Sequence, residues 1–152
     1  MKKDPILYVV IPCYNEEEVL PETTKRMKEK LTSLIKSKVI SSKSKVMYVN
    51  DGSKDKTWEM IKDINKKEPL FTGVTLSRNR GHQNALLAGM LTVKNDCDIV
   101  ISMDADLQDD INAIDEMIDK YNLGNDIVYG VRSSRKKDTW FKKILRNCFI
   151  SL

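Results

Sequence analysis

The stretch "DIVISMDADLQDD", residues 98–110, joins a short apolar run to a cluster of acidic residues. The run, residues 98–103, is apolar on successive positions and rich in β-branched side chains, which is typical of a strand covered on both faces. Asp104 and Asp106 follow, one residue apart, with further carboxylates behind them. Carboxylates this close repel one another unless water or a cation separates them. The stretch therefore predicts a buried strand that ends in a polar site.

Similar apolar runs recur along the chain, separated by helical patterns. They span residues 6–11, 46–49, 73–76 and 126–130. The helices predicted between them begin near Pro21, Asp55 and His82, and a fourth is capped by Asp109 or Asp110 and stops near Gly124. Strands that alternate with helices of about 10–15 residues predict right-handed βαβ units. We therefore expect an α/β fold, with a mainly parallel sheet flanked by helices on both faces.

A polar segment follows each of the first four predicted strands, and in a parallel sheet these segments lie at the same edge. Parallel sheets bind ligands at the carboxyl ends of their strands. In this chain the segments at those ends read "PCYNE", "NDGSKD", "SRNRGHQ" and "DADLQDD". The functional residues are expected among them.

The length and composition of the chain indicate one globular domain. The chain has 152 residues, of which 41% are hydrophobic and 32% charged. It opens with no secretory signal, and it lacks the run of roughly 18 apolar residues that could span a bilayer. Its 3 cysteines are widely spaced and form no C-x-x-C pair, so neither a disulfide framework nor a thiolate metal site is indicated. We expect a soluble or peripheral protein in a reducing cytosol.

Positive charge is concentrated at the C-terminal end. The net charge is +4, but residues 132–152 contain seven basic residues and one acidic one, which gives 7 − 1 = +6 and leaves 4 − 6 = −2 for the rest. This distribution argues against a nucleic-acid-binding protein with a basic face throughout. It favours local attraction of one end to an anionic partner.

Elimination narrows what the acidic cluster can bind. The chain has no G-x-G-x-x-G after its first strand and no G-x-x-x-x-G-K-[ST], which excludes the common dinucleotide and P-loop sites. An EF-hand loop starting at Asp104 would need a glycine and a glutamate where the chain has Asp109 and Asp115. A magnesium or manganese ion, completed by substrate phosphates, remains. In an extended segment Asp104 and Asp106 point to the same side, and Gln108 could add a neutral oxygen.

Other interpretations of these acids stay open. The acidic residues could be solvated loop residues followed by a helix cap. A magnesium-dependent phosphohydrolase or phosphotransferase also uses aspartates at strand ends, although such enzymes usually carry a nucleophilic aspartate where this chain has "PCYNEE". A non-catalytic binding module is a further alternative.

Five ordered segments resemble the family 2 glycosyltransferases. They are "IPCYNEE", "VNDGSKDKT", "SRNRGHQNALLAG", "MDADLQDD" and "DIVYGVRSSR", and together they cover residues 6 to about 135. Within that family the segments are most similar to the branch that transfers a sugar from a nucleotide to a polyprenyl phosphate, such as the bactoprenol glucosyltransferases and dolichyl-phosphate mannosyltransferases. The resemblance implies a GT-A fold, residues 1–135 as the nucleotide-sugar-binding catalytic domain, and an inverting, metal-dependent transfer.

The resemblance also implies roles for individual residues. Asp104, Asp106 and Gln108 would form the shell of a magnesium or manganese ion beneath the donor diphosphate. Asp51 would accept a hydrogen bond from the base, and Arg132 would lie near the phosphates, so that Asp104, Asp106 and Arg132 are the expected catalytic residues. The residues expected to bind the nucleotide sugar are Pro12, Tyr14, Asn15, Glu16, Val49, Asp51, Arg78 and Ala105.

Two positions depart from the family pattern. Asn50 stands where the family usually has an aspartate, but the base contact is expected from the next residue, Asp51. Asp110 replaces a common proline after "DLQD". Either residue suits the start of a helix, so we expect little consequence.

The proposed partners follow from the same resemblance. The donor is expected to be a UDP-sugar, with a GDP-sugar as the alternative, and the acceptor a polyprenyl phosphate at the inner face of the cell membrane. The alternatives are a glycosyltransferase of the same fold that uses a saccharide acceptor, and a non-catalytic module that binds nucleotide sugars at a membrane surface. Residues 136–152 are predicted to form a basic amphipathic helix that lies on an anionic membrane or packs on the sheet or a following domain. Family members usually continue beyond this point, so we expect the chain alone to bind donor but transfer poorly. His82 is expected to serve the start of its helix rather than catalysis.

Overall fold

One parallel sheet forms the centre of the molecule. The structure is a computed structural model that describes residues 4–106 and 110–130. The described strands are β1 (Leu7–Cys13), β2 (Lys45–Asn50), β3 (Phe71–Thr75) and β4 (Ile99–Ser102), and they pair in the order β3-β2-β1-β4. All three pairings are parallel. These four predicted strands are confirmed to within two residues at each end.

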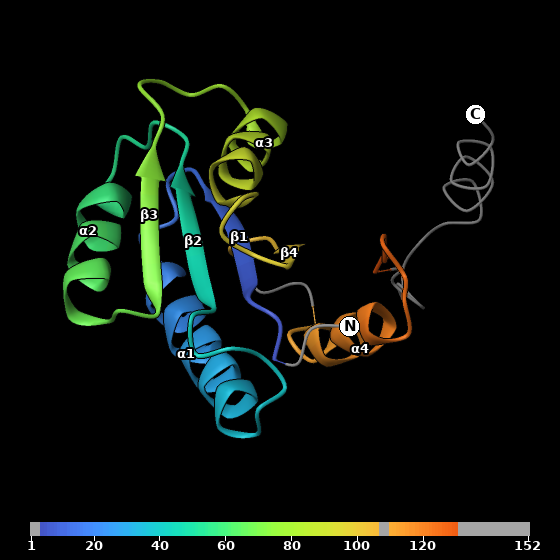
Figure 1. Cartoon of the computed structure of the whole chain (residues 1–152). Coiled ribbons are helices and arrows are strands. Elements are labelled where there is room, and N and C mark those ends of the chain that lie inside the picture. The colour runs from blue at the N-terminus through green and yellow to red at the C-terminus, as the bar shows by residue number, and fades with distance from the viewer. Residues whose placement is uncertain (1–3, 107–109, 131–152) are drawn as a thin grey trace, which may run out of the picture.

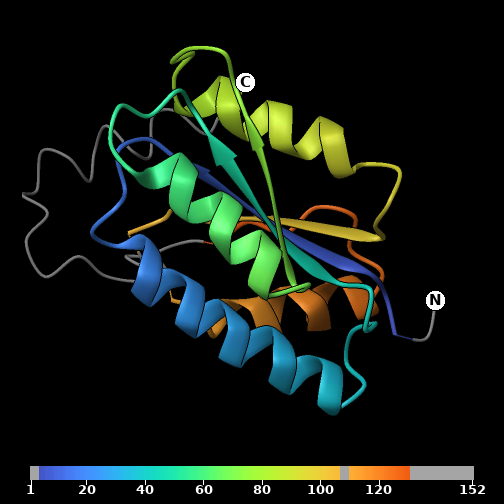
Figure 2. The same cartoon turned by 90° about the vertical axis from the view of Figure 1, so that its left-hand side faces the viewer.

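Helices cover both faces of the sheet, as predicted. The described helices are α1 (Leu20–Lys36), α2 (Thr57–Lys67), α3 (His82–Val93) and α4 (Ala113–Asn122). Buried residues of α1, α2 and α4 share a core with one face of the sheet, and those of α3 share a second core with the other face. Figures 1 and 2 show this three-layer arrangement, with α3 alone on its side of the strands.

The alternation of side chains along β1 explains the two cores. Val9 and Ile11 belong to the larger core, whereas Val10 points to the opposite face. All three are fully buried, as expected of a central parallel strand. Helix α3 can pack closely against this second face because Gly89 has no side chain. A Cβ on Gly89 would lie only 2.5 Å from Val10 Cγ1 and 2.6 Å from Val49 Cγ2.

The fifth predicted strand, residues 126–130, is wrong. These residues have no regular secondary structure, and Ile127 and Tyr129 are 71% and 83% exposed. An apolar, β-branched run gives a propensity only, and a strand forms when its backbone groups find a paired neighbour. Within the described residues β4 pairs with β1 alone, so this segment has not joined the sheet.

The start of α4 also differs from the prediction. The N-cap residue is Asn112, and its side chain makes no capping hydrogen bond. Asp110 lies before it and accepts the backbone N–H of Asn112 at 2.9 Å, so it orders the turn that precedes the helix. Asp109 lies outside the described residues. Across residues 4–106 and 110–130, no helix combines the length and the apolar character that crossing a membrane requires.

Candidate functional site

A small cavity lies at the carboxyl ends of β1 and β4. It has a volume of about 300 Å³ and is lined by Pro12, Glu16, His82, Asp104, Ala105 and Asp106. Five of these residues were predicted from the sequence to bind donor or metal, and they come from two segments more than 85 positions apart. The order of the strands explains the meeting, because β1 and β4 are direct neighbours in the sheet.

The two acidic residues stand on a fixed backbone. Asp104 and Asp106 are exposed, whereas Met103 before them and Ala105 between them are buried. The Met103 N–H donates to the Val10 carbonyl at 3.1 Å, which continues the pairing with β1 beyond the end of β4. The Thr23 hydroxyl of α1 donates to the Ala105 carbonyl at 2.6 Å. Both carboxylates line the cavity, although Ala105 and Asp106 lie in a turn rather than in the extended segment that the sequence predicted.

Negative charge accumulates around the cavity. Burial raises the pKa of the Glu16 carboxyl, and the carboxylates of Asp106, Asp55 and Asp104 raise it further. A cation in the cavity would relieve the repulsion that raises this pKa. The electrostatics of the site thus favour a positively charged ligand.

His82 is a cavity residue that the sequence interpretation assigned only to the start of a helix. It is the first residue of α3, and its Nε2 lies 3.6 Å from Asp104 Oδ1. Its imidazole lines the cavity together with Asp104 and Asp106. Its position in "SRNRGHQ", one of the four strand-end segments, was the available signal.

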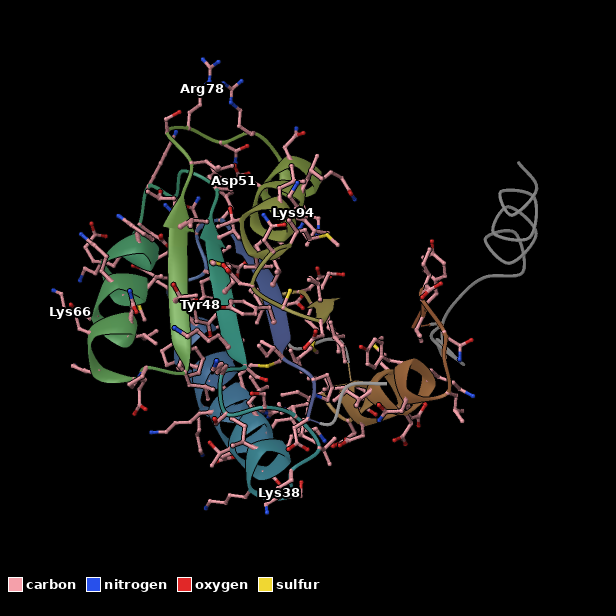
Figure 3. All side chains as sticks on the ribbon, viewed as in Figure 1. Lys38, Tyr48, Asp51, Lys66, Arg78 and Lys94 are labelled. Atoms are coloured by element: carbon pink, nitrogen blue, oxygen red, sulfur yellow. The ribbon has the colours of Figure 1, made fainter. Side chains whose placement is uncertain are left out.

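Asp51 has a structural role that the sequence did not reveal. Its side chain is 3% exposed, and its two carboxylate oxygens accept the backbone N–H groups of Arg80 at 2.7 Å and Gly81 at 2.9 Å. Asp51 therefore connects the end of β2 to the loop before α3. Figure 3 shows Asp51 and Arg78 at this end of the sheet, with Arg78 on the exposed loop. Each carboxylate oxygen keeps a second lone pair, so a base contact by Asp51 stays a prediction.

Val49 faces away from the cavity. Its side chain is fully buried in the core between the sheet and α3, where it approaches Gly89. Val49 was expected among the residues that bind the nucleotide sugar, and with its side chain buried here a contact through its backbone stays a prediction. Alternation along β2 puts Val49 in this core and its neighbour Tyr48 in the larger core on the other face.

The loops that follow β1 and β2 form one interlocked unit. Asn15, at a positive φ of 55°, donates its backbone N–H to Ser53 Oγ at 3.0 Å, and its side-chain oxygen accepts the Lys54 N–H at 2.8 Å. The Glu16 N–H donates to Thr57 Oγ1 at 2.8 Å. Asn15 thus orders the loop that carries Glu16. Tyr14 is 40% exposed and does not line the cavity.

Two predicted site residues, Gln108 and Arg132, lie outside the described residues. Within residues 4–106 and 110–130, no group of three or more His, Cys, Asp or Glu residues is arranged to hold a metal ion. Asp104 and Asp106 nevertheless fit the manner in which magnesium is usually held, by one or two carboxylates together with substrate phosphates.

Comparison with known proteins identifies the family. The model of the family described as "Glycosyl transferase family 2" matches residues 8–150, nearly the whole chain. The chain belongs to glycosyl transferase family 2. The expected GT-A form of the α/β fold is confirmed by this membership and by the likeness to a solved structure described next.

Relatives of this family 2 chain include proteins of known name. YkoT of Bacillus subtilis (strain 168), an uncharacterized glycosyltransferase, is 50% identical over 142 residues, which cover 93% of this chain and 42% of YkoT. A prophage bactoprenol glucosyl transferase homolog of Escherichia coli (strain K12) is 33% identical over 144 residues, 95% of this chain and 44% of the homolog. The chain therefore spans less than half the length of these relatives.

A solved structure has a similar fold and a related sequence. The mannosyltransferase PcManGT from Pyrobaculum calidifontis, in complex with GDP-Man and Mn2+, aligns with a TM-score of 0.57 and 26% sequence identity. The alignment covers 68% of this chain and 28% of PcManGT.

Proposed function

We propose that this chain is the donor-binding catalytic domain of an inverting, metal-dependent glycosyltransferase that moves a hexose from a nucleotide to a polyprenyl phosphate. The donor is UDP-glucose or a related UDP-hexose, with a GDP-sugar as the alternative. The observation that carries the proposal is the pair Asp104 and Asp106, which face a cavity that Glu16 and His82 also line. The name of the Escherichia coli homolog supports the sugar and the acceptor.

Asp104 and Asp106 are the residues that would hold a magnesium or manganese ion, with Gln108 as a third oxygen donor. Two carboxylates on alternating positions leave the remaining ligand positions for donor phosphates and water. The GDP-Man and Mn2+ bound to PcManGT support this combination of ligands. When bound, the ion would stabilise negative charge on the departing nucleoside diphosphate.

With the proposed acceptor, a general base in the cavity becomes optional. A phosphate monoester has a second pKa of about 6, so it is largely a dianion at neutral pH. A phosphate oxygen forms the new bond to the anomeric carbon from the face opposite the diphosphate, while the bond from that carbon to the diphosphate oxygen breaks. Attack from the opposite face inverts the anomeric configuration.

Cationic side chains are needed to bring two anions together. Arg78 is exposed at the strand ends, and Arg132 and Arg135 follow the last described residue by two and five positions. We propose that Arg132 reduces the repulsion between acceptor and donor phosphates. Because the acceptor is a membrane lipid, the reaction would take place at the cytoplasmic face of the cell membrane.

A thermal-shift panel tests donor and metal together. The 152-residue chain is mixed with UDP-glucose, UDP-N-acetylglucosamine or GDP-mannose, each with and without Mn2+. We expect the largest rise in Tm with a UDP-hexose plus Mn2+, because ligands that bind only the folded state stabilise it. Asp106→Asn should lose most of this rise.

The matched control is Asp119→Asn, an exposed aspartate of α4 that does not line the cavity. It should retain the full rise. A donor shift that is independent of Mn2+, or one that Asp106→Asn leaves unchanged, would overturn the metal-dependent proposal.

A further inference from the structure

A second, larger groove lies beside β4 on the side away from β1. It has a volume of about 1150 Å³ and runs between β4, α4 and residues 125–130. Apolar side chains from α3, β4, α4 and the last described segment line it, among them Met90, Ile99, Val100, Met117, Ile127 and Tyr129. Large apolar side chains that are exposed together, such as Ile127 and Tyr129, indicate a surface that another segment or partner covers.

The strand pairing along this groove is also incomplete. Within the described residues β4 pairs only with β1, so its outer edge has no partner strand. Proteins usually cover or pair such an edge, because exposed N–H and C=O groups invite association. Both the apolar lining and the open edge therefore call for the same covering segment.

Charge around the groove restricts what can cover it. Asp98, Asp110, Glu116 and Asp126 line the groove, and no Lys, Arg or His of the described residues does. Asp98 additionally accepts the Ile6 N–H at 2.8 Å, so it is fixed in place. An occupant with apolar and basic side chains would match this lining, whereas an anionic lipid surface would be repelled.

The end of this chain has that composition. Residues 131–152 contain seven basic residues and one acidic one, with Trp140, Phe141, Ile144 and Leu145 among them. The segment begins directly after Gly130, where an added Cβ would lie 3.1 Å from Met117 Cε in the groove. The family match extends to residue 150, so most of this segment belongs to the same domain.

We propose that residues 131–152 cover the groove beside β4, with their apolar side chains against its lining and the basic side chains that follow Arg135 against its carboxylates. The segment then serves the catalytic domain as a packed part of it rather than as a membrane-binding element. The inference rests on the groove and its charge, and it is independent of the donor and acceptor proposed above.

Trp140 provides a direct probe, since the chain has only one other tryptophan, Trp58. In the full chain with Trp58→Phe, acrylamide quenching of Trp140 is measured without lipid over a range of protein concentrations. We expect a quenching constant several-fold lower than that of N-acetyltryptophanamide, at every concentration. Fluorine NMR of the unsubstituted chain labelled with 5-fluorotryptophan gives the same information if Trp58→Phe fails to fold.

Charge reversal tests the electrostatic part of the proposal. Glu116→Lys combined with Asp126→Lys should raise Trp140 quenching several-fold, and adding Lys142→Glu with Lys143→Glu should lower it again. The matched control is Glu29→Lys, an exposed glutamate of α1 outside the groove, which should leave quenching unchanged.

Three outcomes would overturn the proposal. The first is solvent-like quenching of Trp140 that falls only after phosphatidylglycerol vesicles are added, because a membrane would then be the occupant. The second is shielding that depends on protein concentration, because a second copy would then cover the groove. The third is shielding that the Glu116 and Asp126 reversals leave unchanged.

Discussion

The carboxylate of Asp51 accepts the backbone N–H of Arg80 across 2.7 Å, and this bond joins the end of β2 to the loop before α3. The other oxygen of Asp51 accepts the Gly81 N–H. A nearly buried carboxylate that receives two N–H groups is bound by charge-assisted hydrogen bonds. Asp51 therefore fixes the start of α3, where His82 enters the cavity.

Replacing Asp51 should reduce the stability of the chain, whether or not Asp51 also contacts the nucleotide. Asp51→Ala leaves two N–H groups without their acceptor, and we expect the free energy of unfolding to fall by about 2–4 kcal/mol. Urea denaturation measures this loss. The control Asp119→Ala, at an exposed position, should cost less than about 0.5 kcal/mol. An Asp51→Ala protein as stable as the original chain would contradict the connecting role.

Gly52 allows the same loops to approach each other. It has a φ of +67°, and an added Cβ would lie 2.6 Å from both Arg78 C and Asn79 N. Gly52→Ala should therefore combine backbone strain with a collision against atoms that cannot rotate away. We expect a larger loss of unfolding free energy than for Gly124→Ala, by about 1–3 kcal/mol.

Gly124 is a suitable control because it isolates the strain. Its φ is +92°, but an added Cβ would meet nothing within 4 Å. If the two alanine variants unfold at the same urea concentration with the same slope, the close approach between Gly52 and the Arg78 backbone contributes nothing.

Asn50, a departure from the family pattern, has a hydrogen-bonding reason to remain an amide. Its Nδ2 donates to Thr75 Oγ1 at 2.8 Å, and its Oδ1 accepts the Ser53 N–H at 3.2 Å. An ionised aspartate could keep the second bond but could not donate the first. It could pair with Thr75 only if that hydroxyl turned away from the Leu76 carbonyl, to which it now donates at 3.3 Å. Asn50→Asp should therefore cost about 1 kcal/mol of unfolding free energy at neutral pH.

A double-mutant cycle with Thr75→Val assigns that loss to the bond between strands. In the Thr75→Val background the amide of Asn50 has already lost its acceptor, so Asn50→Asp should cost less than in the original chain. Equal costs in both backgrounds would show that the Asn50–Thr75 contact is not the reason for the amide.

The sequence predicted the layers of the fold because its signals there are local. Buried positions recur at a regular spacing along a strand or a helix, and apolar residues in the sequence recur at the same spacing. The run at residues 98–103 and the helical pattern after Pro21 are examples. Residues 126–130 carry the same apolar signal, but a strand also needs a partner strand, which a local pattern does not specify. The prediction failed at that point for this reason.

The site was predictable to the extent that strand order could be assumed. Pro12, Glu16 and Asp104 meet because β1 and β4 are neighbours, and the carboxyl-end rule for parallel sheets anticipates such a meeting. The bonds of Asp51 and the interlocking of Asn15 with the next loop depend on three-dimensional distances between loops. No spacing in the sequence encodes them.

Glu16 should make the stability of the chain depend on pH. Its pKa is raised by burial and by neighbouring carboxylates, so folding favours the protonated form. The stabilising contribution of this group is therefore present below the unfolded pKa of about 4.3 and is lost as pH rises through the higher folded value. Glu16→Gln removes the ionised carboxylate and should raise Tm at pH 7 in metal-free buffer, with no gain below about pH 4.

Glu22 supplies a control of opposite sign. A hydrogen bond from Arg26 lowers the pKa of its carboxyl, so its contribution is present at neutral pH and is lost on acidification. Glu22→Gln should therefore leave Tm at pH 7 unchanged or slightly lower, since the pair is exposed. Because a cation in the cavity offsets the repulsion around Glu16, Mn2+ with UDP-glucose should shrink the advantage of Glu16→Gln at pH 7. An advantage that persists with both ligands bound would place the cation away from Glu16, Asp104 and Asp106.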